Sequence, residues 1–344
     1  MKQGIQNILS FLLIFLPVIC CTSCITSEDF ADTHRGTYEA LWTLLDEHYC
    51  FFDYKQKEYG LDWNEVRERY NPQVTEKMSS EALFQVLSNL TYELRDGHCN
   101  LVTGRDVSGY AQWYEAYPMN FSDSLLHKYV GNRDDYRTTC GMKYRVLEGN
   151  VGYVRCSTFD VGMGDGNFHY IFDYLGTCDG LIVDVRSNSG GMLTSAATLA
   201  GAFVNEPTIG GYIRHKTGPG HADFSEPQPM MLTPASGFRW QKPVVVLTNR
   251  RTYSAANAFV MFMKAAGVTL VGDRTGGGSG MPFSSELPNG WSVRFSACPM
   301  TDFEGHDTEF GIEPDYHVDI SSEDYQRSVD SILEFALALL KRRN

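Results

Sequence analysis

The stretch Pro243-Val-Val-Val-Leu-Thr-Asn-Arg-Arg-Thr-Tyr-Ser-Ala-Ala-Asn-Ala-Phe-Val-Met-Phe-Met-Lys264 decides the fold. Its first residues form a short apolar and β-branched run, which is typical of a buried strand. The residues after Ser254 are rich in Ala, Met and Phe and contain no Gly or Pro, which favours a buried helix. We therefore predict a strand, a tight turn and a helix, with Ser254 where the turn becomes the helix.

Ser254 has two interpretations. Ser is a favoured N-cap, and for this stretch alone the cap is the simpler one. The alternative is a nucleophile, because the N–H groups at a helix start are unpaired and can hold an oxyanion. A second strand–loop–helix pattern supports the alternative. The apolar run 180–185 leads into Gly190 and Gly191, whose paired backbone can expose successive N–H groups. Together the two units indicate acyl-transfer chemistry.

These two units resemble peptidase family S41, which includes the C-terminal processing proteases and the tricorn core protease. The motifs occur in the family's order over about residues 150–320 and are Gly180-Leu-Ile-Val-Asp-Val-Arg-Ser-Asn-Ser-Gly-Gly191, Thr252-Tyr-Ser-Ala-Ala256, Gly272-Asp-Arg-Thr-Gly276 and Gly311-Ile-Glu-Pro-Asp315. The resemblance implies an α/β fold with a ClpP/crotonase-like catalytic core. It also implies Ser254 as the nucleophile, with an oxyanion hole formed by the N–H of Ala255 and that of Gly190 or Gly191.

The sequence departs from the family at one position that bears on catalysis. Members with a Ser-Lys dyad carry Gly-Lys-Gly after the third motif, and here the lysine position falls on Gly278. Lys264 follows Ser254 by ten residues on the predicted helix. That separation is about 15 Å along a helix axis, which is too far to reach the hydroxyl. The base must therefore come from elsewhere.

His98 is the candidate base. It lies in Arg95-Asp-Gly-His98, which resembles the Asp-Gly-His motif of family members that use a Ser-His pair, although Gly97 stands where the tricorn-like pattern has a Ser. His215 and His221 are the competitors, and they lie near the Pro- and Gly-rich segment 217–240, which we expect to be a surface loop. A histidine base predicts that kcat/KM rises between about pH 6 and 7.5.

An acid near Gly311 is expected to orient the histidine. Glu309 is the first candidate, with Glu304 and Asp307 behind it. The resulting hypothesis is a serine-type peptidase that hydrolyses peptide bonds of a peptide or protein substrate without a cofactor or a metal ion. Two alternatives stay open, namely a peptide-binding protein that has lost catalysis and another serine acyl hydrolase such as an esterase.

The N-terminal residues have the features of a targeting segment. Residues 1–23 contain Lys2 and an apolar run over 8–19, which is too short to span a membrane but fits a signal peptide. Cys24 follows a small residue, as at a bacterial lipoprotein cleavage site, and an ordinary secretory signal is the alternative. We predict a lipid anchor at Cys24 and a place in the bacterial cell envelope, facing the periplasm or the cell surface. Six further cysteines suggest neither a metal site nor a specific disulfide.

Composition and periodicity complete the domain prediction. The chain has 344 residues, is 43% hydrophobic and carries a net charge of −13, which argues against nucleic acid as a partner. Apolar residues recur with helical spacing in 24–100, which we predict to be a small N-terminal helical domain. Residues 101–150 show little periodicity and are expected to connect it to a catalytic domain over 151–344. We expect this domain to end in one helix, which starts near Ser321 and buries an apolar face from Val329 to Leu340. The connection is too short for a PDZ domain, and the oligomeric state stays open.

Overall fold

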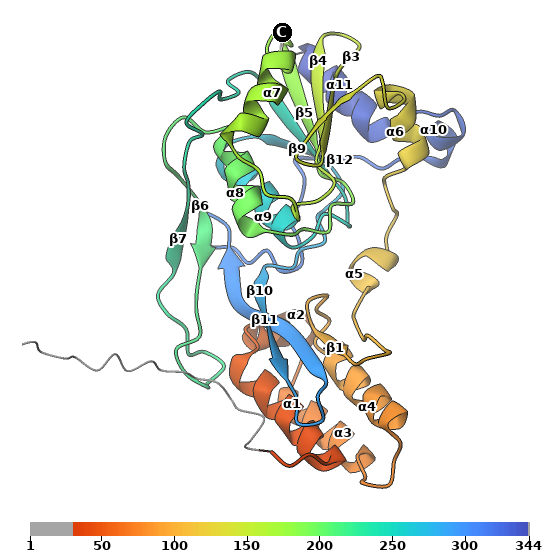
Figure 1. Ribbon diagram of the computed structural model, residues 1–344, viewed down its shortest axis with the longest axis vertical. Helices are drawn as coiled ribbons and strands as arrows, with labels where there is room; N and C mark the ends of the chain where they lie inside the picture. The colour runs from red at the N-terminus through yellow and green to blue at the C-terminus, as the bar shows by residue number, and fades with distance from the viewer. Residues whose placement is uncertain (1–29, 343–344) are drawn as a thin grey trace, which may run out of the picture.

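The structure of the protein is a computed structural model that describes residues 30–342. The predicted signal peptide and Cys24 lie outside the described residues. In Figure 1 the chain forms an upper part built on a sheet with helices on both sides, and a lower part in which helices surround a long hairpin. Within residues 30–342, no helix is both long enough and apolar enough to span a bilayer.

The upper part is built on a sheet of seven strands. Their order is β12-β9-β8-β5-β4-β3-β2. The five strands from β12 to β4 run parallel, and β3 and β2 add antiparallel strands at one edge. Every residue of β4, β5 and β8 is buried, as expected for strands covered on both faces. The strands are β2 Arg137–Thr139, β3 Met142–Leu147, β4 Val151–Arg155, β5 Gly180–Asp184, β8 Val244–Thr248, β9 Thr269–Gly272 and β12 Tyr316–His317.

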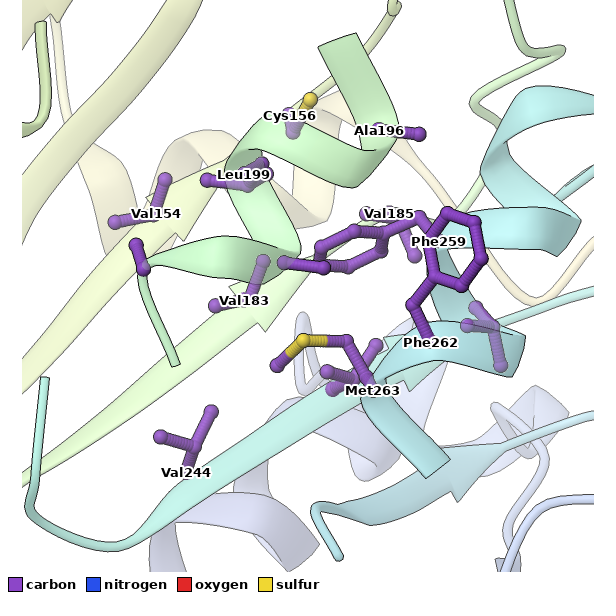
Figure 2. Close-up of a cluster of buried hydrophobic side chains, with 14 of the residues drawn as sticks. Val154, Cys156, Val183, Val185, Ala196, Leu199, Val244, Phe259, Phe262 and Met263 are labelled. Atoms are coloured by element: carbon purple, nitrogen blue, oxygen red, sulfur yellow. The ribbon is translucent and has the colours of Figure 1, made fainter. Parts of the chain in front are cut away.

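Helices cover both faces of this sheet. On one face the main core joins the strands to α7, α8 and α9, and Figure 2 shows Phe259, Phe262 and Met263 of α9 among the valines of the strands. On the other face a smaller core joins the strands to α6 and α11. The helices are α6 Asp123–Val130, α7 Asp165–Leu175, α8 Leu193–Gly201, α9 Ala255–Ala265, α10 Ser322–Gln326 and α11 Ser331–Arg342.

The lower part combines the N-terminal helices with strands from the second half of the chain. Its sheet has the order β1-β11-β6-β7, and β10 pairs with β11. Val293 and Phe295 of β11 pack into the same core as the aromatic residues of the helices, so the hairpin completes the core of the helical part. The elements are α1 His34–His48, α2 Phe52–Tyr59, α3 Trp63–Tyr70, the 3₁₀ helix η2 Asn71–Gln73, α4 Ser80–Tyr92, β1 Asn100–Val102, β6 Thr208–Ile213, β7 Gln228–Leu232, β10 Gly280–Glu286 and β11 Ser292–Thr301, with the short α5 Gln112–Glu115 on the connection to the upper part.

The structure differs from the sequence expectation in three places. The main sheet begins at β2 and β3, inside the segment 101–150 that was expected to be a connection. The segment 217–240 was expected to be a loop and contains β7 as an edge strand. The last helix is interrupted, because Ser328 adopts a φ of 60° that an α-helix cannot contain.

A buried ion network fastens the C-terminal helix to the sheet. Arg186, which follows β5, has no exposed side-chain surface. Its Nη2 lies 2.8 Å from Asp184 Oδ2, and its Nη1 donates to Asp330 Oδ1 at 3.0 Å, just before α11. Burial alone would raise the pKa of Asp184, but Arg186 and Arg155 hold it below its ordinary value. The network therefore depends on charges that are matched within the core.

Replacing Arg186 by Met should destabilise the fold, because the buried Asp330 would lose its counter-charge and the buried Asp184 would lose one of two. Breaking a buried ion pair from one side costs about 3–5 kcal/mol. Urea unfolding followed by circular dichroism measures this, with Arg105→Met as the control on an exposed loop. A loss no larger than that of the control would show that the network does not hold α11 in place.

Candidate active site

The candidate site lies where the parallel strands end. The loops that follow β5, β8 and β9 meet at the carboxyl edge of the sheet, which is where sheets of this type bind ligands. Hydrogen bonds join these loops to one another. The hydroxyl of Thr252 donates to the carbonyl of Val185 at 3.0 Å, and the N–H of Gly276 donates to the carbonyl of Thr252 at 2.8 Å. The N–H of Ser254 donates to the carbonyl of Gly277 at 2.9 Å.

Ser254 occupies the N-cap position of α9 but does not act as a cap. Its backbone has φ 58° and ψ −123°, and its side chain makes no capping hydrogen bond. The hydroxyl Oγ instead lies 2.9 Å from Nε2 of His98. A positive φ at a serine between a strand and a helix is the geometry of a nucleophile elbow, in which the turn exposes the hydroxyl.

His98 projects from the turn that follows α4. Its backbone N–H donates to Asp96 Oδ1 at 2.7 Å, and the hydroxyl of Ser296 donates to Asp96 Oδ2 at 2.7 Å. The imidazole packs on the ring of Tyr253, with centroids 4.9 Å apart. His98 Nδ1 is buried and has no hydrogen-bond partner within the described residues. The turn and the aromatic ring, rather than a bond at Nδ1, therefore hold the imidazole in place.

The imidazole is neutral over a wide pH range. Burial lowers the pKa of His98 to about 4. Arg294 and Lys55 lower it further, and Asp96 opposes them. Above that pH the ring is uncharged. When the ring proton sits on Nδ1, Nε2 can accept the proton of the Ser254 hydroxyl.

The loop after β5 lies directly against Ser254. Gly190 and Gly191 have φ of 105° and 131°, and a Cβ on Gly190 would lie 2.8 Å from the Cβ of Ser254. The N–H of Gly190 donates to Asn188 Oδ1 at 2.9 Å, so this donor is already used. The N–H groups of Gly191 and Ala255 donate no hydrogen bond within the described part of the chain. Of the two glycines considered for the oxyanion hole, Gly191 is thus the one with a free donor.

Glu309 does not contact His98, which corrects the expectation that it orients the imidazole. Its Oε1 lies 3.0 Å from Nζ of Lys55, and its Oε2 accepts the N–H of Ser279 at 2.9 Å. Burial raises the pKa of Glu309, and the Lys55 ammonium opposes this rise and favours the carboxylate. A buried carboxyl needs a counter-charge, and Lys55 of α2 supplies it to Glu309.

The remaining candidates lie away from the pair. Asp307 accepts the N–H of Glu309 at 3.3 Å, and Glu304 is exposed. His215 Nδ1 lies 3.4 Å from Cys298 Sγ, and His221 Nε2 lies 2.9 Å from Asp46. None of these four side chains forms a hydrogen bond with Ser254 or His98 in the described residues.

Two aromatic side chains explain why the chain departs from the family's motifs. A Cβ on Gly278, the lysine position, would lie 2.4 Å from Cζ of Tyr253. A Cβ on Gly97, the helper-serine position, would lie 2.6 Å from Nε1 of Trp113 and 2.8 Å from Oη of Tyr253. The two rings stack with centroids 4.0 Å apart. Sequence reasoning missed this stack, because Trp113 comes from a segment without periodicity.

One group among the described residues has the ligand types and spacing for a metal ion. Its members are Asp302, Glu304 and His306, whose ligand atoms lie within 4.8 Å of one another. Neither Ser254 nor His98 belongs to it. The six cysteines of the described chain are free thiols.

Comparison with known proteins shows which protein families the chain matches. Residues 150–318 match peptidase family S41, and residues 30–91 match the tricorn protease C1 domain. Tricorn protease of Thermoplasma acidophilum is 27% identical over 201 residues, which are 56% of this chain and 17% of that protein. The carboxyl-terminal-processing protease of Synechocystis is 27% identical over 197 residues, which are 56% of this chain and 44% of that protein. The chain therefore spans less than half the length of these relatives.

Solved structures extend the match over most of the chain. A crystal structure of a protein from Parabacteroides merdae, provisionally described as a peptidase, is 46% identical, with a TM-score of 0.84 over 90% of this chain and 96% of that one. Mature CPAF complexed with lactacystin shares the fold, with a TM-score of 0.69 at 13% identity over 90% of this chain and 97% of that one. The motifs, the fold and these matches agree, and the chain belongs to peptidase family S41.

Proposed function

We propose that this chain is a serine peptidase in which Ser254 is the nucleophile and His98 is the general base. The observation that carries the proposal is the 2.9 Å contact between Ser254 Oγ and His98 Nε2, two atoms whose residues lie 156 positions apart in the sequence. The lowered pKa of His98 supports it, because a neutral imidazole is the form that accepts a proton.

The reaction follows from this arrangement. Ser254 Oγ attacks the peptide carbonyl carbon while its proton passes to His98 Nε2, and the carbonyl oxygen becomes an oxyanion facing the N–H groups of Gly191 and Ala255. Collapse of the tetrahedral intermediate breaks the C–N bond, and His98 gives its proton to the departing amine. Water then attacks the acyl-enzyme ester, with its proton going to His98. Collapse of this second intermediate breaks the bond between the carbonyl carbon and Ser254 Oγ, His98 returns its proton to Oγ, and the carboxylic acid product leaves.

The nucleophile and the base can be tested directly. The wild-type protein should react covalently with a fluorophosphonate probe and cleave fluorescein-labelled casein, whereas Ser254→Ala and His98→Ala should do neither, because one lacks the attacking oxygen and the other its proton acceptor. His215→Ala is the matched control and should behave as wild type. An unreactive wild-type protein would favour the non-catalytic peptide binder. Turnover of p-nitrophenyl acetate without cleavage of casein would favour an esterase.

The pH dependence distinguishes this buried histidine from an exposed one. The second-order rate of fluorophosphonate labelling should rise with pH through about 4 and be flat above pH 5, because the base is active only when deprotonated. The ordinary value for a histidine places the rise between about pH 6 and 7.5. Labelling rates measured from pH 3 to 9, with circular dichroism at each pH as the folding control, decide the matter. A midpoint above about pH 6 would show that His98 is not held in a buried, neutral state.

We also propose that the chain is anchored by a lipid on Cys24 in the bacterial cell envelope. The apolar run before a small residue and a cysteine supports this. In a bacterial host, the wild-type protein should sediment with membranes, and Cys24→Ala should move it to the soluble fraction. Cys21→Ala is the matched control and should leave the distribution unchanged. Retention of the Cys24→Ala variant in the membrane pellet would contradict the anchor.

A further inference from the structure

Lys55 is a fully buried lysine beside the candidate site. It lies in the middle of α2 with no exposed side-chain surface, whereas Lys57 of the same helix is exposed. Lysine is rarely buried in this way, because its charge must then be compensated inside the protein. The Lys55 Nζ donates to Glu309 Oε1 at 3.0 Å and to the carbonyl of Arg95 at 3.1 Å. It also lies 4.2 Å from the ring centroid of Phe310.

One of these hydrogen bonds holds the turn that carries the base. Arg95 has a φ of 46°, which is unusual for a residue with a side chain. Its carbonyl accepts from Lys55, and the next residue, Asp96, accepts the backbone N–H of His98 at 2.7 Å. Burial alone would raise the pKa of Asp96, but the charge of Lys55 and the hydrogen bonds from Ser296 and the backbone of His98 hold it below its ordinary value. Lys55 thus fixes both the shape and the charge of the turn.

The other hydrogen bond reaches the loop after β9, which lies next to the nucleophile. Glu309 Oε2 accepts the N–H of Ser279 at 2.9 Å, and the carbonyl of Glu309 accepts the N–H of Gly278 at 2.9 Å. The preceding residue, Gly277, accepts the N–H of Ser254 at 2.9 Å. A continuous path therefore runs from the Lys55 ammonium through Glu309 to the backbone of Ser254.

Lys55 is not itself placed to be the base. Its hydrogen-bond partners are Glu309 and Arg95, not Ser254. Burial would lower its pKa, but the charges of Glu309 and Asp96 outweigh burial and hold it above its ordinary value. The amine therefore stays protonated, and its role lies in what it holds together.

We propose that Lys55 is a positioning residue that keeps Ser254 Oγ and His98 Nε2 at reacting distance by joining the turn of His98 to the loop next to Ser254. The inference rests on the Ser-His function proposed above. Through this role of Lys55, α2 and the other N-terminal helices become a functional part of the active site rather than an accessory domain.

The test compares Lys55→Met with Lys57→Met on the same helix. For Lys55→Met, we expect the maximal rate of fluorophosphonate labelling to fall by about a hundredfold, because small misplacements of reacting groups cost that much. The half-saturating probe concentration should stay within about twofold, because ground-state binding is not affected. Lys57→Met should match wild type in both.

In a folded variant that keeps His98 buried, the pH profile supplies a readout that a merely structural role of Lys55 would not change. The charged groups that face His98 are Asp96 of its own turn, Arg294 of β11 and Lys55 of α2, and the ring of Tyr253 packs on it. Lys55 lowers the pKa of His98, so its removal should move the acid limb of the labelling rate to higher pH. In Lys57→Met the limb should stay where it is in wild type.

The results distinguish a failure of the positioning role of Lys55 from a failure of the proposed Ser-His function. A folded Lys55→Met variant with the wild-type maximal rate and acid limb would overturn the positioning role. If Lys55→Met does not fold, the double variant Lys55→Met/Glu309→Gln, which removes both buried charges, carries the same test. A wild-type labelling rate in a folded double variant would equally overturn the role. Labelling that persists in Ser254→Ala or His98→Ala would instead refute the proposed function, whatever Lys55 does.

Discussion

The backbone of Ser254 is the constraint around which the molecule is arranged. A non-glycine residue at φ 58° and ψ −123° costs about 1–3 kcal/mol, so the surrounding structure must hold it there. It is held from both sides, because the N–H of Ser254 bonds to Gly277 and the N–H of Tyr253 bonds to Asn188 at 3.0 Å. Gly190 then approaches so closely that only a glycine fits. Three loops from three parallel strands thus meet at one residue, and the sheet beneath them supplies the rigidity.

Charge around the pair is arranged to keep the imidazole neutral. His98 is buried next to one anion, Asp96, and near two cations, Lys55 and Arg294, and burial dominates. A base with a pKa of about 4 is intrinsically weak, so its usefulness depends on being already oriented towards the hydroxyl. The rings of Tyr253 and Trp113 supply that orientation in place of the hydrogen bond that Nδ1 lacks. Aromatic packing therefore orients the His98 imidazole, a task that a carboxylate hydrogen-bonded to Nδ1 could otherwise perform.

Much of this arrangement could be predicted from the sequence, because it is local. The strand–turn–helix around Ser254 and the glycines after β5 follow from short patterns, and both the family and the α/β fold are confirmed. The roles of Ser254 and His98 stay a proposal, although the structure brings their side chains together. Lys55 could not be found, because in sequence it is one of two lysines in a short polar helix. The partner of Glu309 depends on the docking of that helix, which no local pattern encodes.

The shared core of the lower part has a consequence for how the chain acquires its site. Val293 and Phe295 complete the packing of helices that are made much earlier in synthesis, and Lys55 meets Glu309 across 254 residues. During translation the N-terminal helices therefore emerge long before the hairpin that covers them, with apolar surface still open to chaperones. The pairing of residues 98 and 254 is equally remote in the chain. The contact between Ser254 and His98 can consequently form only after synthesis has passed residue 254.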